Sequence, residues 1–215
     1  MNPFLVDSIG ATLNVLSYIS VFPSKMLRPR FDKESWGAVV EAWVTGNLLM
    51  SIVLLATVPT NVKWVHQIVT LYILLRIIEI VVFQFNSQIY GGYPGKDRPR
   101  LHYTVLSYRR SIFLAGLLYV EVIMWFACVY RLYANHFTSS NVSLTHPLKA
   151  LYYSVVTMTT IGYGDVSAIT TFGFGVVIAQ ALIGIFMTLL ILARLVSYLP
   201  RPDTLDPIEK QPAED

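Results

Sequence analysis

The chain has 215 residues, of which 54% are hydrophobic and only 13% are charged. A soluble domain carries about twice that fraction of charged residues, so the composition predicts a protein that contacts lipid. The net charge of +3 is too small to indicate a nucleic-acid partner, and the single cysteine, Cys128, excludes an intrachain disulfide. The sequence has no catalytic or metal-ligand constellation, and we therefore expect neither enzymatic activity nor a cofactor.

Residues 1–35 precede the first long apolar stretch and contain a segment with one apolar face. In a helix over residues 4–22, the face opposite the apolar one would carry Asp7, Asn14 and Tyr18. This pattern predicts an amphipathic helix in the inner membrane interface or against the bundle. A fifth span with an external N-terminus remains an alternative. The apolar positions are Leu5, Ile9, Leu13, Leu16 and Ile19.

Four apolar stretches are long enough to cross a bilayer, which takes about 20 residues. They cover residues 36–58, 64–85, 111–133 and 171–199. Residues 146–158 are also apolar but too short to span, which predicts a re-entrant helix with Thr145 as its cap and Pro147 in its first turn. The expected fold class is an all-α membrane protein with four transmembrane helices, one re-entrant helix and a loop that follows it.

Lysine and arginine residues set the expected orientation, because cytoplasmic loops carry more of them. They gather before the first span and between the second and third, whereas the turn after the first span has only Lys63 and residues 134–145 have none. We therefore expect both termini on the cytoplasmic side of a multi-pass cell-membrane protein. The basic loop could bind anionic lipid headgroups or act only as a topology determinant. Its basic residues are Lys96, Arg98, Arg100, Arg109 and Arg110.

The string Thr159-Thr160-Ile161-Gly162-Tyr163-Gly164-Asp165 directly follows the predicted re-entrant helix. An ion that leaves water needs oxygen atoms in place of its hydration shell, and successive backbone carbonyls can supply them if they point one way. Such a strand alternates between the two helical hands, which glycine does at little cost. Gly162 and Gly164 stand at alternate positions, and Thr160 can add a hydroxyl oxygen. Four chains around one axis would form rings of four oxygens, so the string predicts an ion-selectivity filter.

Residues 108–199 resemble the potassium-channel pore family, whose filter loops read Thr-Val-Gly-Tyr-Gly. Ile161 stands in place of the valine, which is a conservative change. The resemblance implies a homotetramer that binds K+ as its permeant ligand. It also implies that an aromatic residue of the re-entrant pore helix, here Tyr152, bonds Asp165 behind the filter. The implied ion-binding residues are Thr160, Ile161, Gly162, Tyr163 and Gly164, and the implied filter supports are Thr159, Asp165, Tyr152 and Tyr153.

The last span continues the resemblance. A gating hinge is implied at Gly184, with close helix packing of a small residue as the alternative. Ile185, Thr188 and Leu192 are implied to line a cavity, with Leu192 as the candidate inner constriction. The family often has a proline three residues after the filter aspartate, where this chain has Ala168. This departure leaves the conformation of the outer loop open.

These features divide the chain into four parts. Residues 1–35 form the N-terminal segment, and residues 36–106 form a two-helix membrane module with the basic cytoplasmic loop. Residues 107–199 form the pore domain, with outer helix, pore helix, filter and inner helix. Residues 200–215 lack apolar periodicity, which predicts a disordered cytoplasmic tail that is too short for a ligand domain.

Arg76 is the only basic residue deep within the first three spans, whereas a voltage sensor needs arginines at every third position of one helix. We therefore expect no conventional voltage sensor. An unpaired charge at that depth costs several kcal/mol, so Arg76 needs a partner. Glu79 is nearest in sequence, and Glu41 and Glu121 on neighbouring spans are alternatives. The group could be a structural polar cluster, or it could be a degenerate sensor or proton-responsive site.

The sequence therefore predicts a subunit of a K+-selective channel that conducts passively. A non-conducting accessory subunit would be expected to have a damaged filter, and a non-selective cation channel would be expected to lack Tyr163 or Gly164. Both residues are present. The sequon that begins at Asn141 could mark a glycosylated outer loop, or it could have arisen by chance.

Overall fold

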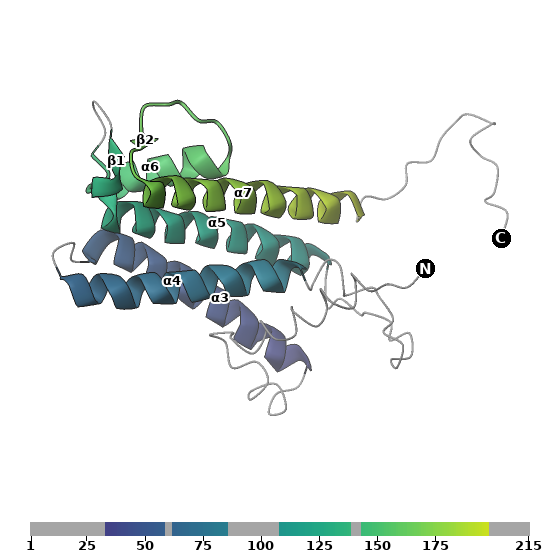
Figure 1. Cartoon of the computed structure of the whole chain (residues 1–215). Helices are drawn as coiled ribbons and strands as arrows, with labels where there is room; N and C mark the ends of the chain where they lie inside the picture. Colours follow the sequence, from purple (N-terminus) through teal and green to yellow (C-terminus); the bar gives the residue numbers. More distant parts are fainter. Residues whose placement is uncertain (1–32, 59–61, 86–107, 139–142, 198–215) are drawn as a thin grey trace, which may run out of the picture.

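The computed structural model describes residues 33–58, 62–85, 108–138 and 143–197 (Figure 1). Four helices in these ranges are long and apolar enough to cross a membrane, which confirms the four predicted spans with small differences at their ends. They are α3 (Lys33–Thr57), α4 (Lys63–Phe85), α5 (Tyr108–Leu132) and α7 (Thr171–Ser197). The predicted helix over residues 4–22, residues 96–100 of the basic loop, Asn141 and the predicted tail lie outside the described residues.

The predicted re-entrant helix is α6 (Pro147–Met158), which packs against α5 and α7. Its N-cap residue is His146, whose side chain makes no capping hydrogen bond. The prediction that Thr145 caps the helix is wrong, because the Thr145 hydroxyl is paired with the Ser143 hydroxyl at 2.7 Å. Pro147 explains how the helix starts without a side-chain cap, since a proline in the first turn brings a helical φ and no N–H that needs a partner.

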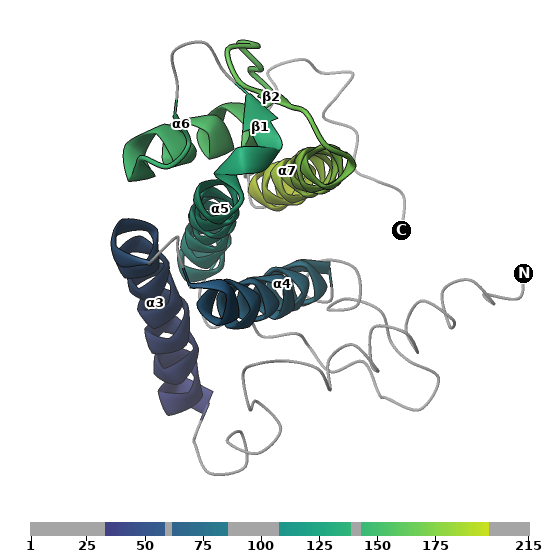
Figure 2. The same cartoon turned by 60° about the vertical axis from the view of Figure 1, so that its left-hand side comes forward.

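Helix α5 is the central element of the subunit. Figure 2 shows it between α3 and α4 on one side and α6 and α7 on the other, and it contacts all four. Residues 121–130 of α5 are all buried, and Trp125 and Tyr130 are among the largest fully buried side chains. Cys128 belongs to this stretch, where its Sγ lies 3.5 Å from the Ser51 carbonyl of α3. A helix that is apolar and covered all round is what the interior of a helix bundle requires.

Helix α7 is the opposite case. Only 17% of its membrane-span window is buried in the subunit, compared with 61% for α5. Many of its exposed side chains are nevertheless large and apolar, and these run from Phe172 to Val196. An apolar face of this length must be covered by lipid or by another protein surface.

A two-stranded bridge that the sequence analysis did not anticipate ties the end of α5 to the loop before α7. Strand β1 (Phe137–Thr138) follows the short 3-10 helix η3 (Ala134–His136) and pairs antiparallel with β2 (Ser167–Ala168). Phe137 lies opposite Ala168, and the Ile169 N–H donates to the His136 carbonyl at 3.0 Å. Strands of two residues are too short to leave an alternating pattern in the sequence. The bridge defines the outer loop at Ala168, which the resemblance left open.

Candidate functional site: the filter segment after α6

The backbone of residues 159–164, the filter segment, alternates in hand from residue to residue. Positive φ angles occur at Thr160 (58°), Gly162 (57°) and Gly164 (76°), but at neither Ile161 nor Tyr163. The two glycines adopt this conformation at little cost. Thr160 is the one non-glycine residue of the described chain with positive φ, and the left-handed conformation costs such a residue about 1–2 kcal/mol. The glycine pattern predicted the alternation at 162 and 164, but nothing in the sequence marked Thr160.

The N–H groups at the start of the filter segment point back to α6. The Thr160 N–H donates to the Thr157 carbonyl at 3.2 Å. The N–H groups of Ile161 and Gly162 share the Val156 carbonyl, at 3.0 and 3.4 Å. In a trans peptide the C=O points opposite to the N–H of the next residue. The carbonyls of residues 159–161 therefore all point away from α6. Successive carbonyls that point one way are what an ion needs in place of its hydration shell.

Two aromatic side chains of α6 have different surroundings. The Tyr152 hydroxyl donates to the Asp165 carboxylate at 2.8 Å, so the expected bond is present, and the Tyr152 ring lies parallel to that of Tyr163 with centroids 6.3 Å apart. This bond raises the pKa of the Tyr152 hydroxyl, because ionisation would remove the proton that the hydroxyl donates to the carboxylate. Tyr153 is buried and packs edge-on against Tyr130 of α5 and Phe137 of β1. Its ring therefore anchors α6 to the neighbouring elements.

The loop that follows the filter segment is held by the bridge and by His136. His136 Nδ1 lies 2.8 Å from the Thr170 hydroxyl oxygen, which also accepts the Gly173 N–H at 3.1 Å in the first turn of α7. A Cβ at Gly173 would lie 2.9 Å from the His136 carbonyl, so glycine allows this close approach. Nothing in the sequence indicated this role of His136, because a lone loop histidine does not reveal its contacts.

Residues 117–201 match a family model described as "Ion channel". The chain carries an ion channel domain. The match runs from within α5, through α6 and the filter segment, to the end of α7, and it confirms the resemblance to the potassium-channel pore family there. Neither the comparison with curated proteins nor that with solved structures gives a match. With four membrane-spanning helices, the chain is a multi-pass membrane protein and a subunit of an ion channel, which is not an enzyme class.

The pore-side surface of this channel subunit is open in the single chain. Ile161 and Tyr163 of the filter segment are 53% and 68% exposed. The implied cavity residues Ile185, Thr188 and Leu192 are exposed as well, on a face of α7 that the rest of the subunit does not cover. An exposed apolar surface of this extent must be covered by lipid or by another protein surface.

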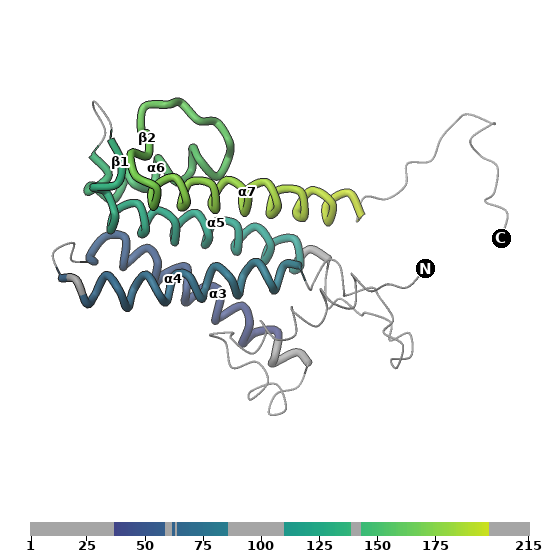
Figure 3. Tube along the Cα trace, in the orientation of Figure 1, coloured from purple at the N-terminus to yellow at the C-terminus, as the bar shows by residue number. Residues whose placement is uncertain are grey.

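Gly184 of α7 is buried against the end of α6. A Cβ at this position would lie 2.7 Å from the Met158 carbonyl, which is closer than real contacts allow. Figure 3 shows α7 as one uninterrupted helix through this point. The close-packing alternative therefore accounts for the glycine here, and a hinge role stays a proposal.

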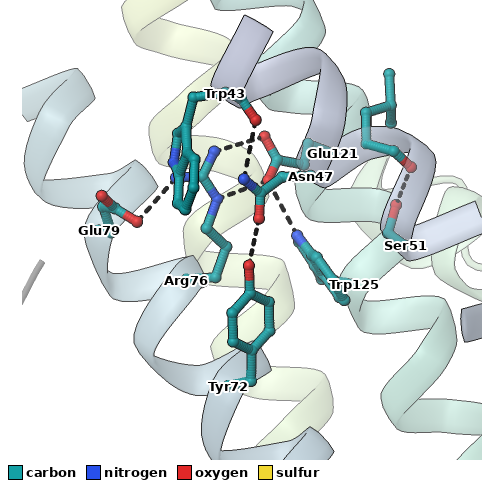
Figure 4. Close-up of polar contacts among 9 residues, drawn as sticks. Trp43, Asn47, Ser51, Tyr72, Arg76, Glu79, Glu121 and Trp125 are labelled. Carbon is teal, nitrogen blue, oxygen red and sulfur yellow. Dashed lines mark hydrogen bonds and ion pairs between the residues drawn. The ribbon is translucent and has the colours of Figure 1, made fainter. Parts of the chain in front are cut away.

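A buried ionic cluster lies between α3, α4 and α5 (Figure 4). Its members on α3 and α4 lie outside the residues that match the family model. Arg76 of α4 donates from Nε and Nη2 to the two carboxylate oxygens of Glu121 of α5, at 2.7 and 3.0 Å. Its Nη1 donates to Glu79 at 2.8 Å, and Trp125 Nε1 donates to Glu121 at 3.1 Å. The Arg76 guanidinium also lies 5.8 Å from the centre of the Trp43 ring. Every guanidinium nitrogen is thus paired, as a buried charge requires.

The expectation that Glu41 could pair with Arg76 is wrong. Glu41 instead pairs with Arg110 at the start of α5, where both side chains are partly exposed. On a helix, positions 41 and 43 point to nearly opposite sides, so Glu41 faces away when Trp43 faces the cluster. Gly37, one turn before Glu41, makes room for the Arg110 guanidinium, because a Cβ there would lie 2.5 Å from its Nη2.

Proposed function

We propose that the chain is one subunit of a homotetrameric, K+-selective channel that conducts K+ passively across the cell membrane. The observation that carries the proposal is the alternating backbone of the filter segment, with the N–H groups of residues 160–162 bonded to α6 and the carbonyls of residues 159–161 turned away. Rings of such carbonyls replace the hydration shell of K+. The proposed ion-binding oxygens are the carbonyls of Thr160, Ile161, Gly162 and Tyr163, with the Thr160 hydroxyl at the inner end. K+ is the permeant ligand, and we propose no resident cofactor.

Four copies of the subunit complete the proposed filter. Each chain has one filter segment, and a ring of oxygens around an ion needs several. The exposed apolar face of α7 and the exposed side chains of Ile161 and Tyr163 supply surface for contacts between copies. Lipid covers the outer faces of α3 and α4, where exposed side chains such as Leu49 and Leu74 are apolar. Both termini lie on the cytoplasmic side in this proposal, and the basic loop meets anionic headgroups.

The support of the filter follows from the contacts of α6. Asp165 is held from behind by Tyr152, and Thr159 turns its hydroxyl back to the Val155 carbonyl at 2.7 Å. These bonds direct polar groups away from the proposed ion path. Gly184 brings α7 close to the end of α6, and the exposed residues Ile185, Thr188 and Leu192 would line the cavity beneath the filter.

Purified protein in liposomes tests the proposal. We expect K+-driven flux that Ba2+ blocks and that Gly162→Asp abolishes, because the new side chain would place a Cβ and a carboxylate at a residue with positive φ in the filter segment. Size-exclusion chromatography of the variant in detergent checks that it still assembles. Equal permeability to Na+ and K+ would contradict the selective function. No flux from well-assembled wild-type protein would indicate an accessory subunit.

A further inference from the structure

A closed network of neutral hydrogen bonds joins α5, α6 and α7 beside the filter segment. Gln180 of α7 donates from Nε2 to both the carbonyl and the hydroxyl oxygen of Ser154 of α6, each at 2.9 Å. The Gln180 Oε1 accepts the Tyr130 hydroxyl of α5 at 2.5 Å, and the Ser154 hydroxyl donates to the Ile123 carbonyl at 2.7 Å. Gln180, Ser154 and Tyr130 are all fully buried. In such surroundings a broken bond leaves a polar group that water cannot satisfy.

The network reaches the part of α6 that holds the filter segment. Ser154 directly precedes Val155 and Val156, whose carbonyls accept the N–H groups of Thr159, Ile161 and Gly162. A rotation or shift of α6 at Ser154 therefore moves the acceptors of the filter segment. Since the carbonyls of Thr160 and Ile161 point opposite to the N–H groups of Ile161 and Gly162, the same motion displaces these two proposed ion-binding oxygens.

A second contact one turn further along both helices fixes the register of α7 on α6. Gly184 lies against Met158, the last residue of α6, and a Cβ there would lie 2.7 Å from the Met158 carbonyl and 3.2 Å from its Sδ. Helix α7 is thus clamped by polar bonds at Gln180 and by close packing at Gly184. Sliding α7 along α6 would break the first contact and produce a clash at the second.

We propose that Gln180 is a positioning residue for ion selection. From the inner helix it sets the place of α6, and through α6 it sets the spacing of the carbonyls in the filter segment. It touches no ion itself. The inference rests on the proposed function, because it concerns selection of K+ over Na+ by the same filter.

The test measures the K+/Na+ permeability ratio from bi-ionic reversal potentials of the purified protein in planar bilayers. Gln180→Leu removes the donor and the acceptor of the amide with little change in volume. We expect a ratio about tenfold below that of the wild type, which corresponds to about 1.4 kcal/mol. A residue that only stabilises the fold would change the melting temperature and leave this ratio unchanged.

Gln84→Leu is the matched control. Gln84 of α4 is also fully buried, but neither polar atom of its amide has a hydrogen-bond partner in the described structure. We expect its permeability ratio to equal that of the wild type. An equal loss in Gln84→Leu and Gln180→Leu would overturn the proposal, since any buried glutamine would then act alike.

Ser154→Ala provides a second arm, which also decides the case if Gln180→Leu does not assemble. It removes the hydroxyl but leaves the Ser154 carbonyl for Gln180, so we expect about a threefold loss in the ratio. Because the two residues act through one contact, the double variant should lose about tenfold and not the product of about thirtyfold. An unchanged ratio in Ser154→Ala or Gln180→Leu, or full additivity, would overturn the role of Gln180. Equal K+ and Na+ permeability in the wild type would instead contradict the proposed function itself.

Discussion

Helix α5 carries two buried polar clusters of opposite character. On its outer side, Glu121 receives the Arg76 guanidinium and the Trp125 indole in an ionic cluster. On its pore side, Tyr130 joins Gln180 and Ser154 in a network without formal charge. The residues of both clusters are buried, yet a charge taken from water costs far more than an amide or a hydroxyl. The ionic cluster therefore tolerates the loss of one member less well than the neutral one.

The comparison also indicates what each cluster can do. The three guanidinium nitrogens of Arg76 are tied to carboxylates on two helices, with a bidentate pair to Glu121. An arginine held in this way favours the interpretation as a structural polar cluster that joins α4 to the channel domain. The neutral network stands between the inner helix and the filter segment, where small displacements of α6 reach the carbonyls. The ionic cluster thus lies on the outer side of α5, and the neutral network lies on the side next to the proposed ion path.

The largest expected effect is that of Glu121→Ala on stability. The variant removes the bidentate partner of Arg76, and arginine cannot lose its proton to relieve the burial. We expect the free energy of unfolding to fall by about 3 kcal/mol, measured by thermal unfolding in detergent micelles. A loss below that of Gln180→Leu would contradict the ranking of the two clusters.

A triple variant sharpens the same comparison. Arg76→Met, Glu79→Leu and Glu121→Leu together remove all charge from the cluster, and such replacements are often neutral or stabilising. We expect most of the stability lost in Glu121→Ala to return. Recordings of the triple variant over a range of voltage and pH should then match the wild type. Altered gating in this stable protein would favour a degenerate sensor or proton-responsive site.

Gly184→Ala should have the next largest effect on stability, at the contact between α6 and α7. The added methyl would meet the Met158 carbonyl, and overpacking of this kind costs about 1–3 kcal/mol. Lower thermal stability is therefore expected. Gly175→Ala is the matched control in the same helix, because a Cβ there meets nothing within 4 Å in the subunit. Unchanged stability of Gly184→Ala with altered opening would favour the hinge role over close packing.

The smallest effect is expected for Glu41→Gln. This carboxylate pairs with Arg110 where both side chains are partly exposed, and a solvated ion pair contributes less than about 1 kcal/mol. The loss should shrink further in concentrated salt, because ions screen exposed pairs. Comparison with Glu121→Ala in the same unfolding assay separates exposed from buried ion pairs. A Glu41→Gln loss as large as that of Glu121→Ala would mean that Glu41 is coupled to the buried cluster after all.

The sequence was informative where chemistry is local. Apolar length predicted the four spans, and the alternate glycines predicted the changing backbone hand at Gly162 and Gly164. Thr160 could not be predicted, because a threonine rarely adopts positive φ unless its surroundings impose it. Of the two Arg76 partners, only Glu79 could be predicted, because it lies one helical turn along the same helix. Whether Glu41 or Glu121 would also face Arg76 depended on how the helices pack.

The roles of the two buried glutamines lay beyond the sequence. Gln84 and Gln180 each lie in an apolar stretch, and hydropathy treats them alike. Only the packed structure gives Gln180 three hydrogen bonds across two helices and leaves the Gln84 amide without one among the described residues. Contacts between elements depend on helix rotation and register, which periodicity along one helix does not define.

The shared Val156 carbonyl has a mechanical consequence. Two successive N–H groups of the filter segment, those of Ile161 and Gly162, are attached to this one oxygen atom. If that acceptor moves, the carbonyls of Thr160 and Ile161 move with it, because each belongs to a peptide plane whose N–H is fixed there. Two neighbouring layers of a fourfold filter would then have one degree of freedom between them. Such a filter would change the ion affinity of these two layers together, and not by separate adjustment of single rings.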